Sequence, residues 1–231
     1  MEGNFLRLQS TASLLTFFVT RNRLQLYGSG NLSRVVTLDV PQTIEKDLEI
    51  VDYPGFISML DLWCTNLKLG ASDAVIIFSE DVYFVKEALE NDSEDKAMNE
   101  ANTFIQSVPF EHSAVKRFSI GSAKQLVAAN ERYMTVLIDG LRTHDITVLG
   151  VVPVFVLEGQ GAKRVLDPDM AKYVSSHLDT LKPMSIVPPE RPRETPSKEV
   201  EVFAKKNQRF VVFLGVFVVL IIVLAILLLL R

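Results

Sequence analysis

Three histidines are the side chains of this sequence best suited to metal binding or to general acid and base catalysis. His112, His144 and His177 lie far apart along the chain, and none stands in a ligand pattern such as His-Glu-x-x-His. Ser113 follows His112, but the Gly-x-Ser-x-Gly turn that presents a nucleophilic serine is absent. We therefore predict no catalytic residues and no metal site.

A short run of carboxylates offers the oxygen ligands that a hard cation such as Ca²⁺ prefers. Its spacing does not match a calcium-binding loop, and acidic runs are commonly solvated. We therefore interpret the run as a surface loop. It consists of Glu90, Asp92, Glu94 and Asp95.

Two glycine pairs invite comparison with loops that hold nucleotide phosphates. They are Gly28-Ser29-Gly30 and Gly159-Gln160-Gly161. Neither has the spaced third glycine of a dinucleotide site or the Gly-Lys-Ser/Thr ending of a P-loop. We interpret both as chain reversals, and we predict no cofactor and no cofactor-binding residues.

The net charge limits the class of partner, and the single thiol indicates the cellular compartment. The formal net charge of the 231 residues is −4, which argues against nucleic acid as the main partner. Cys64 is the only cysteine, so an internal disulfide is excluded and a reducing cytoplasm is favoured.

Apolar runs separated by turn residues predict strands. A polar turn at residues 20–23 joins the first two into a hairpin, and the strand at 83–86 is expected to pair beside the buried run at 74–78. The predicted strands are 14–19, 24–27, 35–40, 74–78, 83–86, 115–120, 125–129 and 146–156.

Four segments with helical spacing separate these strands. The first begins at Pro54 and ends at Gly70, and the third is capped by Asn130. The second places Met98 on its apolar face, and the last begins with Asp167 as cap. Together the elements predict an α/β fold, a sheet covered by helices.

One segment near the C-terminus has the length and composition of a membrane-spanning helix. It extends from Phe210 through Leu220 to Leu230 without a charge, a proline or a hydrogen-bonding side chain. As a helix rising about 1.5 Å per residue it spans roughly 31 Å, the thickness of a bilayer's hydrocarbon core. Gly215 has no small residue four positions later, so a close glycine-mediated helix pair is not indicated, and the oligomeric state stays open.

The charges beside this segment predict its orientation. Lys205, Lys206 and Arg209 precede it, whereas Arg231 alone follows it. By the positive-inside rule, the N-terminal part is expected on the cytoplasmic side of a cell's inner membrane. With Arg231 as the C-terminus, the chain is a single-pass protein that ends in its own anchor.

Between the α/β region and the anchor, the composition changes. Half of the ten prolines fall here, among many charged residues, a composition that favours an extended tether over a packed core. The predicted organisation is a cytoplasmic α/β domain at 1–181, a tether at 182–209 and a transmembrane helix at 210–230.

Two segments resemble a known family. Residues 100–111, EANTFIQSVPFE, form an amphipathic helix that leads into a Pro-Phe turn, while residues 125–131, QLVAANE, open a strand, helix and strand that run to Leu157. They are similar to segments of the actin-like PilM family of pilus assembly proteins and its type II secretion relatives. The similarity covers about residues 14–157. It implies an incomplete actin-like, or ribonuclease H-like, sheet with the opening hairpin beside the 74–78 strand.

The sequence departs from that family where phosphate would bind. Actin-like ATP-binding proteins place an Asp-x-Gly phosphate loop in the opening hairpin, where backbone amides hold phosphate. The corresponding turn here, residues 20–23, has neither aspartate nor glycine. The second phosphate loop, expected after Leu157, is replaced by a helix, the tether and the anchor. The resemblance therefore implies no ATP binding.

The resemblance implies a scaffold and not an enzyme. The expected function is a membrane-anchored adaptor of a type IV pilus-like or type II secretion-like inner-membrane assembly. Its expected protein partners include a short cytoplasmic tail of a membrane protein. Two alternatives remain: a nucleotide-binding actin-like ATPase domain at the membrane, and an unrelated tail-anchored protein.

Overall fold

The computed structural model describes residues 14–28, 32–88, 93–121, 123–157 and 164–187. The chain divides into two units, Met1–Glu190 and Arg191–Arg231, and every described residue belongs to the first. The predicted anchor, with Phe210, Gly215, Leu220 and Leu230, lies outside the described residues, as do Lys205, Lys206 and Arg209. Within the described part, none of the helices is long and apolar enough to cross a bilayer.

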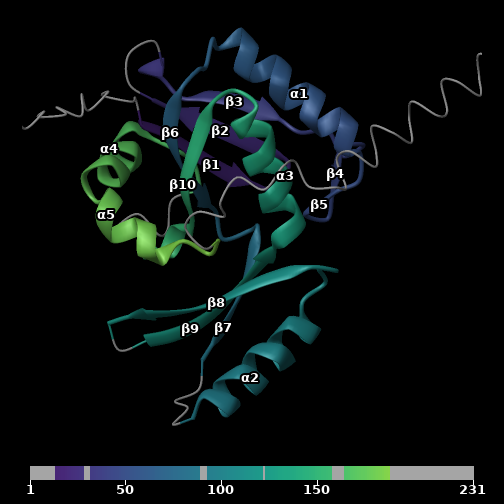
Figure 1. Cartoon of the computed structure of the whole chain (residues 1–231), viewed down its shortest axis with the longest axis vertical. Helices are drawn as coiled ribbons and strands as arrows, with labels where there is room; N and C mark the ends of the chain where they lie inside the picture. The colour runs from purple at the N-terminus through teal and green to yellow at the C-terminus, as the bar shows by residue number, and fades with distance from the viewer. Residues whose placement is uncertain (1–13, 29–31, 89–92, 122, 158–163, 188–231) are drawn as a thin grey trace, which may run out of the picture. The chain divides into compact units, whose positions relative to one another are not determined.

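A five-stranded sheet, called the large sheet below, forms the centre of the fold (Figure 1). Its order is β10-β6-β1-β2-β3, with β6 parallel to both β1 and β10, and β2 antiparallel to both of its neighbours. Its strands are β1 (Leu14–Thr20), β2 (Arg23–Tyr27), β3 (Val36–Asp39), β6 (Ser72–Phe78) and β10 (Ile146–Pro153). The prediction that the opening hairpin lies beside the 74–78 strand is confirmed.

Helices cover the large sheet, and their three predicted starting signals are confirmed. Asn130 caps α3 (Glu131–Arg142) by accepting the Tyr133 N–H at 3.0 Å, and Asp167 caps α4 (Pro168–Ser176). Pro54 lies in the first turn of α1 (Tyr53–Asn66). Figure 1 shows α4 and α5 (Leu178–Leu181) on the side of the sheet opposite α3. The mixed α/β fold with flanking helices is therefore as predicted.

Two helix ends differ from the prediction. Gly70 does not end α1, because the left-handed conformation after the helix is taken by Lys68, with φ 54°. The single helix predicted after Asp167 is interrupted at His177, so α5 follows as a separate turn and continues into the 3-10 turn η3 (Lys182–Met184).

A second, three-stranded antiparallel sheet, called the small sheet below, has the order β7-β9-β8. Its strands are β7 (Tyr83–Glu87), β8 (Ser113–Ile120) and β9 (Ala123–Asn130). The predicted pairing of the 83–86 strand beside 74–78 is wrong: β7 pairs with β9 instead. The physical reason is that β6 already has β1 on one side and β10 on the other.

The helix α2 (Glu94–Ser107) packs on the small sheet and corrects two predictions. Glu94 and Asp95 belong to this helix and not to a loop, because the Ser93 hydroxyl accepts the Lys96 N–H and starts the helix earlier. Met98 is 59% exposed, whereas Phe104 is buried. The buried face instead includes Glu100, which pairs with Arg117 of β8 at 2.7 Å.

The folded region continues past the predicted start of the tether. Residues 182–187 include η3, and Ser185 and Ile186 are both buried. The Ile186 N–H donates to the Val151 carbonyl of β10 at 2.7 Å. The compact part of the chain therefore extends at least to Val187, and not to Leu181.

Candidate functional site

The turn between β1 and β2, residues 20–23, is the position at which the resemblance places a phosphate loop. Its Arg21 N–H donates to Asp81 Oδ2 at 3.1 Å, and its Asn22 N–H donates to Glu45 Oε1 at 3.1 Å. Asn22 has φ 59°, a left-handed conformation that asparagine tolerates better than most residues. These two N–H groups, called the turn amides below, are therefore already bonded to carboxylates of the same chain.

Asp81 is brought to the turn by the reversal after β6. The Ser79 N–H donates to the Val19 carbonyl of β1 at 2.9 Å, which holds the start of this reversal against the end of the hairpin strand. The Ser79 hydroxyl lies against both the Val19 carbonyl and the Asp81 carboxylate. The parallel pairing of β1 and β6 thus carries Asp81 to the turn.

Glu45 comes from the short hairpin of β4 (Glu45–Lys46) and β5 (Glu49–Ile50), and it is fully buried. Its Oε2 accepts the Tyr133 hydroxyl of α3 at 3.3 Å. Burial raises the pKa of Glu45 above its ordinary 4.5, although the bonds from Asn22 and Tyr133 oppose that rise. Burial, with the neighbouring Glu45, also raises the pKa of Tyr133.

Asn130 completes a continuous network around the turn. Its side-chain amide donates to the Leu48 carbonyl at 3.2 Å, while its side-chain oxygen accepts the Tyr133 N–H. The residue is therefore both the cap of α3 and the support of the β4–β5 hairpin. The network connects the turn amides through Glu45 and Tyr133 to the start of α3, so the carboxylate is held in place from two sides.

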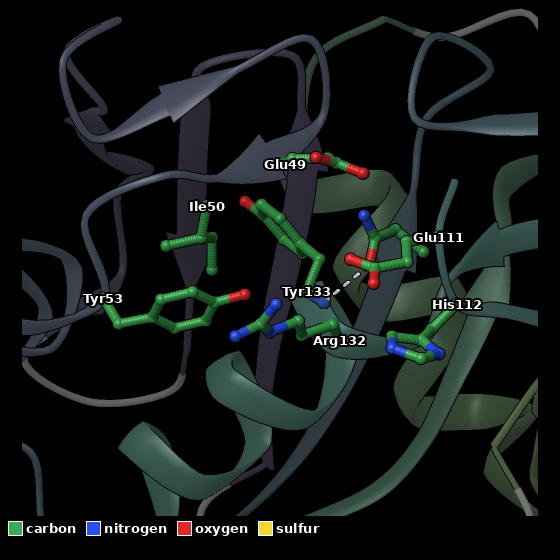
Figure 2. Close-up of a pocket in the computed structure, with 8 residues that line it drawn as sticks. Glu49, Ile50, Tyr53, Glu111, His112, Arg132 and Tyr133 are labelled. Atoms are coloured by element: carbon green, nitrogen blue, oxygen red, sulfur yellow. Dashed lines mark hydrogen bonds between the residues drawn. The ribbon is translucent and has the colours of Figure 1, made fainter. Parts of the chain in front are cut away.

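A small pocket lies beside this network (Figure 2). Its volume of about 40 Å³ holds one or two water molecules, since a water occupies about 30 Å³ of liquid, whereas small-molecule sites measure about 300 Å³ or more. Figure 2 shows Arg132 facing the Tyr53 ring, which its guanidinium covers at 4.4 Å. The lining residues are Glu49, Ile50, Tyr53, Glu111, His112, Asn130, Arg132 and Tyr133.

The histidines are not brought together. His112 lines the pocket, the Nε2 atom of His144 lies 3.0 Å from Asp61, and His177 stacks on Tyr173. Within the described ranges, no group of three or more histidine, cysteine or acidic side chains is placed to hold a metal ion. The three histidines therefore lie in three different environments.

The other side chains singled out in the sequence have ordinary packing roles where the structure describes them. Cys64 is buried in α1, and burial, with Asp61 nearby, raises its thiol pKa to about 11. A Cβ atom at Gly28 would come within 2.7 Å of the Leu15 side chain, so a larger residue there would force that buried side chain to shift. Glu90, Asp92, Gly30 and the 159–161 glycine pair lie outside the described residues.

Sequence reasoning did not find Glu45 or Asp81. Their partners lie 23 and 60 residues away, and neither carboxylate stands in a local motif. The only signal was negative, namely the lack of aspartate and glycine at residues 20–23.

No family model and no curated protein matches this sequence. Among solved structures, the chain is similar to the PilM-PilN type IV pilus biogenesis complex, with a TM-score of 0.42 and 14% identity over 60% of this chain and 46% of that one. It is also similar to the cytoplasmic domain of EpsL, an inner membrane component of the type II secretion system of Vibrio cholerae, with a TM-score of 0.41 and 8% identity over 63% and 59%.

A third similar structure is a Bacteroides thetaiotaomicron protein with an actin-like ATPase fold and unknown function. Its TM-score is 0.36, with 11% identity over 61% of this chain and 53% of that one. The described chain therefore spans about half the length of the solved structures that it matches. These low-identity neighbours are PilM-like and EpsL cytoplasmic domains and an actin-like ATPase fold.

Proposed function

We propose that this chain is a non-enzymatic, membrane-anchored scaffold of a pilus-like or secretion-like assembly. The observation that carries this proposal is the occupation of the turn amides by Asp81 and Glu45. A phosphate loop needs free backbone N–H groups aimed at the ligand. Here a phosphate group would have to displace two carboxylates of the protein, and it would meet their negative charge.

Electrostatics support the same conclusion. Two like charges about 4 Å apart repel by about 4 kcal/mol at an effective dielectric constant of 20. Asp81 and Glu45 both approach the turn amides, and the charge of Arg21 offsets only part of the burial effect on Glu45. An incomplete actin-like domain of this kind keeps the sheet and the helices while its phosphate position is filled from within.

The membrane part of the proposal comes from the sequence. Residues 210–230 form the anchor, while Lys205, Lys206 and Arg209 keep the α/β domain on the cytoplasmic face of the inner membrane. A domain that is held at a bilayer and lacks catalytic groups acts by binding other proteins there. The partner class that we propose is the short cytoplasmic tail of another membrane protein in the assembly.

Nucleotide binding separates this scaffold from the alternative of an ATPase domain. The full chain in detergent is titrated with a fluorescent ATP analogue and Mg²⁺, with unlabelled ATP as competitor. We expect no saturable binding in the micromolar range, which corresponds to about −8 kcal/mol. Competable, Mg²⁺-dependent binding in that range would overturn the non-enzymatic assignment.

A double substitution makes the titration sharper. Asp81→Asn with Glu45→Gln removes both negative charges from the turn amides while keeping the size of the side chains. If the carboxylates are what excludes phosphate, this variant binds the analogue no more weakly than the wild type. A wild type that binds better than the double variant contradicts the proposal, because the carboxylates would then assist binding, as Mg²⁺ ligands do.

The scaffold role itself is tested by cross-linking in the cells that make the protein. A tagged full chain is cross-linked in intact membranes, and its covalent partners are identified by mass spectrometry. A chain without residues 210–230 is the matched control, and we expect it to lose the membrane partners. Absence of envelope-assembly or motor proteins among the partners of the full chain removes the proposal's main support.

A further inference from the structure

Residues 182–187, called the clasp below, lie along the outer edge of the large sheet. The strand β10 is the terminal strand of that sheet. Within it, the Val151 N–H donates to Ser185 Oγ at 2.9 Å, and the Val151 carbonyl accepts the Ile186 N–H at 2.7 Å. Both backbone groups of Val151 are thus satisfied by the clasp, as a neighbouring strand would satisfy them.

Lys116 of β8 holds the same segment from the small sheet. Its Nζ donates to the Pro183 carbonyl at 2.7 Å and to the Ser185 carbonyl at 2.6 Å. Hydrogen bonds from a charged donor are roughly twice as strong as neutral ones. Figure 1 shows the yellow-green end of the described chain where β10 and β8 approach it. One lysine therefore connects the two sheets through the clasp.

The sequence of β10 allows the clasp to approach this strand closely. Gly150 interrupts an apolar strand, and the pairing of β10 with β6 shifts register between Val148 and Gly150. A Cβ atom at Gly150 would lie 3.2 Å from the Ser185 Cβ atom, which is closer than ordinary packing. Glycine in a strand interior often marks the close approach of another backbone, and the clasp is that backbone here.

We propose that the clasp, locked by Lys116, closes the edge of the large sheet and ties it to the small sheet. The residues that follow Val187 then begin at this joint and not at a free end. Force applied to those residues is transmitted to β10 and β8 together. The joint therefore links attachment at the C-terminal side to the relative position of the two sheets. This inference does not depend on the proposed function.

Hydrogen exchange of the full chain in detergent, followed by mass spectrometry, tests the clasp. Lys116→Met removes the charged donor and keeps an unbranched side chain that is one atom shorter. We expect exchange in the peptides that contain Val151 and Ile186 to rise at least about a hundredfold, in proportion to the two lost bonds. Lys86→Met is the matched control, because Lys86 lies on the exposed strand β7 of the same small sheet, and it should leave both peptides unchanged.

Amides of α3 report whether a variant has unfolded as a whole. If Lys116→Met raises their exchange as well, Ser185→Ala decides, because it removes only the acceptor of the Val151 N–H. Faster exchange at Val151 in that variant, with α3 unchanged, supports the clasp. Unchanged exchange at Val151 and Ile186 in both variants overturns the proposal.

Discussion

At the scale of single residues, Glu45 is a carboxylic acid removed from water. It is fully buried, and its two oxygens accept from a backbone amide and from a tyrosine hydroxyl. A buried ionised carboxylate is costly unless its partners offset the loss of hydration. The rise in its pKa means that burial outweighs the hydrogen bonds, so Glu45 reduces the stability of the folded chain when it is ionised.

The first prediction concerns Glu45→Gln and pH. The folded state binds the Glu45 proton more tightly than the unfolded chain does, so this residue lowers the free energy of unfolding as the pH rises above 4.5. Glutamine cannot ionise and can still meet both partners. The stability of the variant relative to the wild type should therefore increase with pH, by about 1.4 kcal/mol for each unit of pKa difference.

Urea denaturation of the two proteins between pH 4 and pH 8 measures this difference. Glu45→Ala is the control, because it leaves the Asn22 N–H and the Tyr133 hydroxyl without their acceptor and should cost about 2–4 kcal/mol. Parallel stability curves for Glu45→Gln and the wild type would show that the carboxylate is not strained by burial.

The second prediction concerns Cys64, whose thiol is buried in α1 and has a pKa of about 11. At pH 7 only about one molecule in ten thousand carries the reactive thiolate. We expect a maleimide to label the native protein far more slowly than the denatured one. Labelling at similar rates with and without denaturant would mean that the helix opens frequently around Cys64.

At the scale of elements, local signals were readable in the sequence, and distant pairings were not. Asn130 and Asp167 were recognised as caps because a cap acts within three residues of its own position. The partner strand of β7 was not recognised, since β9 lies some forty residues further along the chain. Met98 was assigned to the buried face of α2, whereas that face carries Glu100, whose partner Arg117 lies on another element.

The third prediction compares these two caps. Asn130→Ala removes the cap of α3 and also the donor to the Leu48 carbonyl, so it should cost about 2–3 kcal/mol. Asp167→Ala removes the bond to the Met170 N–H at the start of α4 and should cost about 1 kcal/mol. Thermal unfolding of both variants measures the difference, at roughly 2–4 °C per kcal/mol. Equal losses would mean that Asn130 does not support the β4–β5 hairpin.

At the scale of the whole molecule, the large sheet accounts for the carboxylates at the turn amides. Parallel pairing of β1 with β6 places the reversal after β6 beside the hairpin turn, which is how Asp81 reaches the turn amides. The small sheet does not join the large one, because both edges of β6 are already paired, with β1 and with β10. The hairpin and the α/β class were predictable from periodicity, whereas the site depends on contacts between segments that only the fold brings together.

The last prediction concerns residues 210–230, for which the sequence alone provides the argument. Nineteen of these 21 residues are Phe, Val, Leu or Ile, each worth about −0.3 to −0.6 kcal/mol near the bilayer centre, so insertion is favourable by about 6–11 kcal/mol. One arginine at the centre costs only about 2.5–3.5 kcal/mol on the same scale. After an alkaline wash, we therefore expect the full chain and Leu220→Arg to remain with the membranes. Deletion of residues 210–230 should release the protein, and release of the full chain would show that the segment is not an anchor.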